Sequence, residues 1–165
     1  MSDIIERAGM TPGAFYYHFS SREQLLKEVV GGFADDWVTT IETLLEAAQT
    51  PQDLQLVPEQ LLDRIDAAPQ AARIYFLNDA SAPALVEQVH GEARARLMRA
   101  ATTAIRRLAP ERDLVTAKVN GVSMVVLYEM AARSHLMLDE TYRTLGPRRF
   151  REELARLSAV TSGIA

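Results

Sequence analysis

A helix stop followed at once by a helix start constrains this chain more than any other feature. Gly9 can take the left-handed conformation that ends a helix, Thr11 is a typical N-cap, and Pro12 suits the first helical position. Ser21 then caps another helix, with Gln24 completing a capping box. The chain therefore begins with a helix, a tight turn and two further helix starts, which is the order of parts in a helix-turn-helix.

The short helix after Pro12 has two distinct faces. Phe15 and Phe19 are four residues apart and share its inner face. The remaining side chains are predicted to face outward, and with the flanking Thr11 and Arg22 they form one surface: Thr11, Pro12, Gly13, Ala14, Tyr16, Tyr17, His18 and Arg22. Two phenols and an imidazole exposed on one turn predict a surface that binds a partner.

These residues also carry a family resemblance. The set Gly9, Thr11, Gly13, Tyr16, His18, Phe19, Arg22 and Leu25 to Leu26 resembles the second half of the helix-turn-helix of TetR-type transcriptional repressors. In that family the recognition helix enters the major groove, and a long helix joins it to an all-helical body that binds a ligand and dimerises. The resemblance implies that Thr11, Tyr16, Tyr17, His18 and Arg22 bind phosphates of double-stranded operator DNA. Gly13 and Ala14 would allow close approach to base edges.

The family's head has three helices, and the residues before Gly9 supply only the second. The first helix would cover the apolar side chains of Ile4, Ile5, Phe15, Phe19 and Leu26. We therefore expect the native chain to start upstream of Met1, with about twenty more residues forming a basic amphipathic helix. The alternative is a dimeric small-molecule-binding module of the same architecture without a competent DNA-binding head.

Composition narrows the function further. The chain has 165 residues, 48% of them hydrophobic, no cysteine and a net charge of -4, so DNA contact must be local rather than spread over a basic surface. We expect a cytoplasmic protein without disulfides, cofactors or a membrane span. His18, His90 and His135 lack the spacing of a metal site, and the chain has no nucleophile elbow, phosphate loop or HExxH motif, so we expect no enzyme.

Apolar spacing of three and four residues predicts an all-α chain throughout. We expect one long helix from Leu26 to Ala48, ended by Thr50-Pro51, and a second from Pro83 to Leu108. Shorter helices are expected around 61–65 and 74–78, another long one from Pro110 towards Leu136, and the last after Gly146-Pro147. The predicted domains are a partial helix-turn-helix head over 1–30 and a ligand-binding and dimerisation body over 31–165.

Gly31-Gly32 falls inside the first long helix, between head and body. Each glycine costs about 1 kcal/mol against alanine in a helix interior, so the pair needs a reason. One reason is a compliant point through which the body re-aims the head. The other is close packing against a neighbouring helix.

The body is predicted to hold a pocket and a dimer interface. Bulky apolar groups mixed with isolated polar ones mark the candidate ligand-binding residues: Phe33, Trp37, Ile41, Ile74, Tyr75, Val86, His90, Asn120, Met124 and Tyr128. The candidate homodimer contacts are Gly121, Val125, Phe150, Leu154 and Leu157. Together these features predict a repressor released from its operator by a small, mostly hydrophobic effector.

Overall fold

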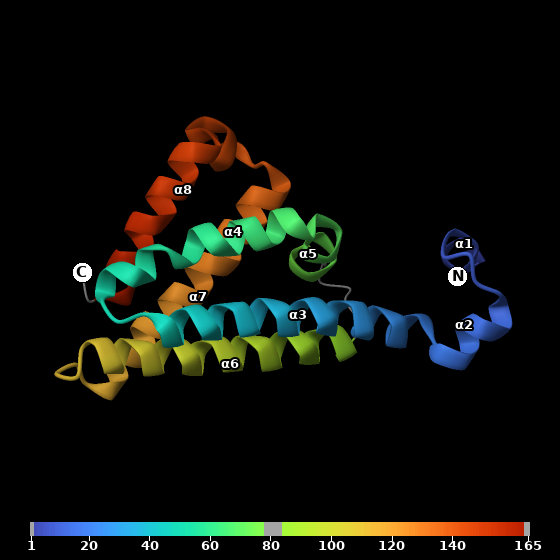
Figure 1. Cartoon of the computed structure of the whole chain (residues 1–165), viewed down its shortest axis with the longest axis horizontal. Helices are drawn as coiled ribbons and strands as arrows, with labels where there is room; N and C mark the ends of the chain where they lie inside the picture. The colour runs from blue at the N-terminus through green and yellow to red at the C-terminus, as the bar shows by residue number, and fades with distance from the viewer. Residues whose placement is uncertain (1, 78–83, 164–165) are drawn as a thin grey trace.

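The computed structural model describes residues 2–77 and 84–163 (Figure 1). Within these ranges the regular elements are all helical, which confirms the all-α prediction. They are α1 (Ser2–Arg7), α2 (Pro12–His18), α3 (Arg22–Ala47), the 3-10 turn η1 (Pro51–Gln55), α4 (Val57–Ala67), α5 (Pro69–Phe76), α6 (Ala84–Leu108), α7 (Leu114–Met137) and α8 (Glu140–Ser162).

The helix stop and starts of the head lie where the sequence predicts them. Gly9 has a φ of +63°, and the Thr11 hydroxyl accepts a hydrogen bond from the Ala14 N–H at 3.2 Å. Ser21 caps α3 by accepting from the Gln24 N–H at 3.1 Å. The Gln24 side chain accepts from the N–H of Ser20, one residue before the cap. Local chemistry is therefore sufficient to set the boundaries of α2 and the start of α3.

Helix α3 connects head and body. In Figure 1 it lies along α6 and continues past the end of α6 to the separate α1 and α2. Its inner face is buried at Val30, Trp37 and Ile41, as the apolar stripe predicts. On α6, Arg96 bonds to Asp35 at 3.1 Å and Glu42 at 2.8 Å, so charged contacts join the two long helices as well.

The glycine pair lies within an uninterrupted α3. A Cβ atom added to Gly31 or to Gly32 would meet no atom of the described residues, 2–77 and 84–163, within 4 Å. The close-packing explanation of this pair is therefore wrong, and a compliant point in α3 stays a prediction.

Aspartate caps set the starts of the last two long helices. Helix α7 begins at Leu114, not at Pro110, because the Asp113 carboxylate accepts from the N–H groups of Val115 and Thr116. Helix α8 consists of two helical segments joined by a kink. The first begins at Glu140, where Asp139 caps it, and the second follows the non-helical Gly146, which has a φ of +74°, so the predicted helix after Gly146-Pro147 is confirmed.

Candidate nucleic-acid interface and ligand sites

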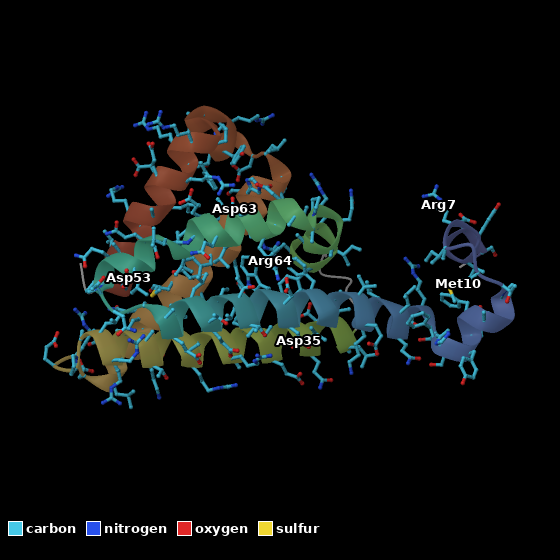
Figure 2. The ribbon with its side chains drawn as sticks, in the orientation of Figure 1. Arg7, Met10, Asp35, Asp53, Asp63 and Arg64 are labelled. Atoms are coloured by element: carbon cyan, nitrogen blue, oxygen red, sulfur yellow. The ribbon has the colours of Figure 1, made fainter. Side chains whose placement is uncertain are left out.

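The predicted DNA-binding residues form one exposed surface. All eight, from Thr11 to Arg22, are exposed, with Tyr17 at 85% and Tyr16 at 54%. Phe15 is 1% exposed and holds the inner face of α2, as its spacing predicts. This surface lies on the head, which Figure 2 shows apart from the body near the labelled Arg7 and Met10. Phenol, hydroxyl and guanidinium donors on one exposed turn are suited to phosphate oxygens.

The core of the body holds an aromatic cluster of Phe33, Trp37, Tyr75 and Phe76. Phe33 stacks on Trp37 with centroids 6.2 Å apart, and Phe76 meets Trp37 edge-on at 5.0 Å. Tyr75 lies 5.3 Å from Phe33, so rings from α3 and α5 interlock. The hollow beside the cluster, between Tyr75 and His90, measures about 20 Å³ and is large enough for about one water molecule.

His90 of α6 lies beside this cluster. Its ring lies edge-on to Tyr75 at 4.6 Å, and its Nε2 atom is buried without a hydrogen-bond partner among the described residues. Burial lowers the pKa of His90 below its usual value of 6.5 and raises the pKa of Tyr75 to about 12. Both groups are therefore neutral near pH 7.

Two of the predicted polar ligand contacts serve the fold instead. Asn120 donates its side-chain N–H to the Ser162 carbonyl at 2.8 Å. The buried Tyr128 hydroxyl bonds to the Ser158 hydroxyl at 2.9 Å, and Ser158 donates to the Leu54 carbonyl at 2.8 Å. These groups join α7 to α8 and η1, so the structure does not bring them to a pocket.

The apolar members of the predicted ligand set are also mostly core residues. Ile41, Val86 and Met124 are at most 1% exposed, whereas Ile74 is 39% exposed on α5. Of the ten residues predicted to bind ligand, the structure gathers Phe33, Trp37, Tyr75 and His90 around the aromatic cluster. Packing of side chains, not open space, explains their spacing.

Most of the predicted dimer contacts lie inside the protomer. A Cβ atom on Gly121 would lie 2.9 Å from the Thr102 hydroxyl, so Gly121 packs against α6. Val125, Phe150 and Leu154 are at most 5% exposed within their own chain, and Leu157 is half-buried. The prediction that Gly121, Val125, Phe150 and Leu154 lie at a dimer surface is therefore wrong, whereas that of Leu157 stays a prediction. Helix α7 is apolar on several faces, and hydrophobicity alone does not show which face is inside.

The other side of α7 is an exposed apolar stripe. It consists of Val115, Val119, Val122, Val126 and Met130, each between 40% and 71% exposed. By length and composition α7 is also apolar enough to cross a membrane, but its inner side is packed into the core at Met124 and Tyr128. We call these five residues the α7 outer stripe.

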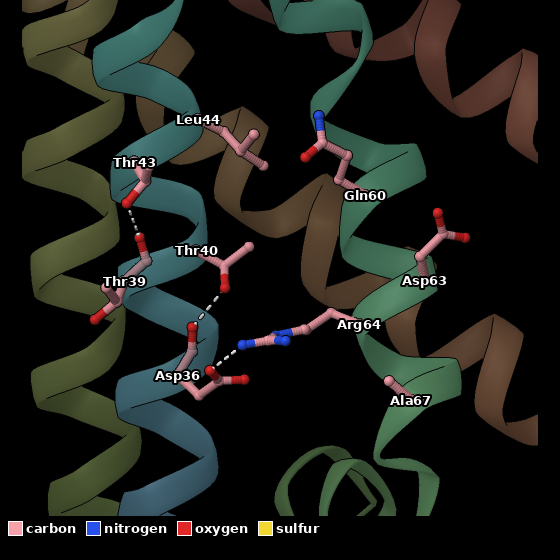
Figure 3. A pocket seen from close by; sticks show the side chains of 9 residues that line it. All are labelled: Asp36, Thr39, Thr40, Thr43, Leu44, Gln60, Asp63, Arg64 and Ala67. Carbon is pink, nitrogen blue, oxygen red and sulfur yellow. Dashed lines mark hydrogen bonds and ion pairs between the residues drawn. The ribbon is translucent and has the colours of Figure 1, made fainter.

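A groove of about 550 Å³ lies between α3 and α4, where the sequence prediction placed nothing. Figure 3 shows Arg64 of α4 extending across this groove to Asp36 of α3, with Thr40 and Thr43 along the α3 wall. In the sequence this groove is marked only by threonines and an aspartate on the polar side of α3. They form a binding surface only because α4 lies opposite them in the fold.

Comparison with known proteins connects the head to a family. Residues 1–29 match the family model described as bacterial regulatory proteins of the tetR family. The HTH-type transcriptional repressor KstR2 of Rhodococcus jostii (strain RHA1) is 31% identical over 74 residues, which cover 44% of this chain and 36% of that protein. KstR2 of Mycolicibacterium smegmatis is 37% identical over 49 residues, 30% of this chain and 24% of the relative. The chain thus matches about a third or less of these relatives' length.

The fold as a whole also has a solved counterpart. A putative TetR-family transcriptional regulator from Syntrophomonas wolfei str. Goettingen matches with a TM-score of 0.75 at 15% identity. The match covers 99% of this chain and 83% of that chain. At this identity the likeness concerns the fold alone, and it extends from the head over the whole body.

Proposed function

We propose that this chain, which belongs to the tetR family of bacterial regulatory proteins, is a DNA-binding transcriptional repressor that works inside the cell as a homodimer. The observation that carries the proposal is the head. Its eight candidate DNA-binding residues are all exposed on α2 and its flanks, and the N-caps of α2 and α3 are formed.

The α7 outer stripe supports the homodimer. Five exposed apolar side chains at helical spacing form an apolar surface whose exposure to water is unfavourable. A second copy of the same helix is complementary to this surface. A two-fold dimer would present two heads to a palindromic operator, with half-sites about one helical turn apart.

Release by a small effector is the finer part of the proposal. Helix α3 is shared by head and body, so a ligand that favours one orientation of α3 changes the spacing of the two heads. The mostly hydrophobic effector predicted from the sequence would require the aromatic cluster to open, because the hollow there holds about one water molecule.

The experiment is a selection of duplexes from a random library by the purified chain, followed by affinity measurements on the enriched sequence. We expect a palindrome. Tyr16→Ala should weaken binding by about 1 kcal/mol, roughly fivefold, through one lost phosphate contact. Arg22→Ala should lower the slope of affinity against salt by about 1.

Arg148→Gln is the matched control, because Arg148 is an arginine on α8 whose side chain is 92% exposed. It should leave both affinity and salt slope unchanged. Enrichment of no common sequence, or unchanged binding after replacing Tyr16 and Arg22 together, would contradict the proposed head.

A further inference from the structure

The groove between α3 and α4 has the size of a ligand site. Its volume of about 550 Å³ falls within the range of about 300–1,000 Å³ that is usual for small-molecule pockets. Its wall on α3 includes Asp36, Thr39, Thr40 and Thr43, of which Thr39 and Thr43 are exposed (Figure 3). A molecule can therefore enter it without opening the core.

The groove offers one cation and several acceptors. Arg64 is its cation, while Asp36 and Asp63 are its carboxylates. Thr40 donates its hydroxyl hydrogen to the Asp36 carbonyl and Thr43 donates to the Thr39 carbonyl, both at 2.8 Å. These two hydroxyl oxygens are left as acceptors. A complementary ligand has one anionic group and a group rich in N–H or O–H donors.

The ion pair across the groove can be exchanged. The side chains of Asp36 and Arg64 are 44% and 45% exposed, so water screens the pair and it contributes little to the fold. A ligand carboxylate can take Arg64 in a bidentate contact, but it then leaves Asp36 without its cation. A ligand ammonium restores that balance.

We propose that the α3–α4 groove binds a zwitterionic amino acid, with its carboxylate on Arg64 and its ammonium on Asp36. One ligand replaces one ion pair, so no charge is left unpaired. Leu44 and Ala67, the apolar lining residues, contact its side chain.

The position of the groove gives this ligand a regulatory role, a step that rests on the proposed function. One wall is α3, which leads into the head. The other is α4, which Arg151 of α8 fastens through Asp63 at 2.8 Å and Asp66 at 3.1 Å. His135 of α7 also bonds to Asp66 at 2.6 Å. A ligand between the walls thus changes the position of α3 relative to α7, the helix that carries the α7 outer stripe.

The test is direct binding to the purified chain without DNA, followed by NMR. The probes are L-leucine, L-serine, L-lysine and L-glutamate. We expect at least one to shift the Arg64 Nε–H signal and the backbone amides of Thr39 and Thr43. Arg64→Gln should weaken that binding at least tenfold, and Arg148→Gln should leave it unchanged. Thermal unfolding confirms that each variant is folded.

Analogues of L-leucine test the contribution of each charged group to binding. They are 4-methylpentanoate, which lacks the ammonium, and 3-methylbutylamine, which lacks the carboxylate. The chain should bind both at least tenfold more weakly than L-leucine. Asp36→Asn should change this order of affinities. The substitution removes the carboxylate that pairs with Arg64, so 4-methylpentanoate should bind more tightly than it does to the unaltered chain. L-leucine should then no longer bind more tightly than 4-methylpentanoate.

The proposal is overturned if none of the four amino acids shifts these signals. It is also overturned if the Arg64→Gln variant still binds with unchanged affinity, or if the Asp36→Asn variant still prefers L-leucine to 4-methylpentanoate. These outcomes are independent of DNA. A chain that selects a palindrome but binds no amino acid in the groove refutes only this inference, whereas the opposite result refutes only the repressor.

Discussion

At the scale of single residues, the most consequential contact is the buried chain from Tyr128 through Ser158 to Leu54. Because Ser158 donates to the Leu54 carbonyl, its oxygen accepts the Tyr128 hydroxyl hydrogen. Tyr128 is 3% exposed and Ser158 is fully buried, so neither group has water as an alternative partner. Burial also raises the pKa of Tyr128 above its usual range and keeps the phenol protonated.

Ser158→Ala should therefore destabilise the protein more than Tyr128→Phe. The tyrosine variant loses one hydrogen bond, about 1 kcal/mol of unfolding free energy. The serine variant leaves the Tyr128 hydroxyl and the Leu54 carbonyl both unpaired, at about 1–3 kcal/mol for each buried group. Urea unfolding followed by circular dichroism measures the difference. Tyr17→Phe, at an 85% exposed tyrosine, is the control and should change stability by less than about 0.5 kcal/mol.

At the scale of helices, glycines in α3 and α7 have opposite roles. Gly31 and Gly32 face open space, whereas Gly121 lies against Thr102 of α6. The first pair weakens α3 between head and body. Gly121 lets α6 and α7 approach closely.

We expect alanine to stabilise the protein at the first pair and to destabilise it at Gly121. Gly31→Ala and Gly32→Ala should each raise the free energy of unfolding by about 1 kcal/mol, because alanine is the better helix former and meets no neighbour. Gly121→Ala places a Cβ atom 2.9 Å from the Thr102 hydroxyl and should lower stability by about 1–3 kcal/mol. Thermal and urea unfolding test all three, and a loss of stability at Gly32→Ala would contradict the open environment.

At the scale of the whole molecule, the structure predicts which side of α7 another protomer covers. Val126 belongs to the α7 outer stripe and is 48% exposed, whereas its neighbour Val125 is 2% exposed and points into its own chain. An obligate homodimer through this face should bury roughly 2,000 Å² or more.

Val126→Arg should give a folded monomer, and Val125→Arg an unfolded chain. The first variant places a charge in the proposed interface, and the second buries one in the core without a partner. Sedimentation velocity reports the association state and circular dichroism reports the fold. A dimeric Val126→Arg protein would require another interface.

The head and the succession of helices could be predicted from the sequence because local chemistry decides them. The signals at Gly9, Thr11, Pro12 and Ser21 act within four residues, so the turn, the two caps and the exposed face of α2 follow from the chain alone. The spacing of Phe33, Trp37 and Ile41 likewise predicts a buried face whatever covers it.

Only the tertiary structure decided which residues meet. Val125 and Val126 are equally hydrophobic, so the sequence does not show which of them is buried. The structure does, because α6 packs against the side of α7 that carries Gly121, and Val125 is buried whereas Val126 is exposed. The polar groups of Asn120 and Tyr128 resemble ligand contacts until α8 supplies their partners, Ser162 and Ser158. The pairing of Asp36 with Arg64 depends on α4 lying opposite α3. Contacts between distant parts of a chain follow from packing, which no local pattern of residues specifies.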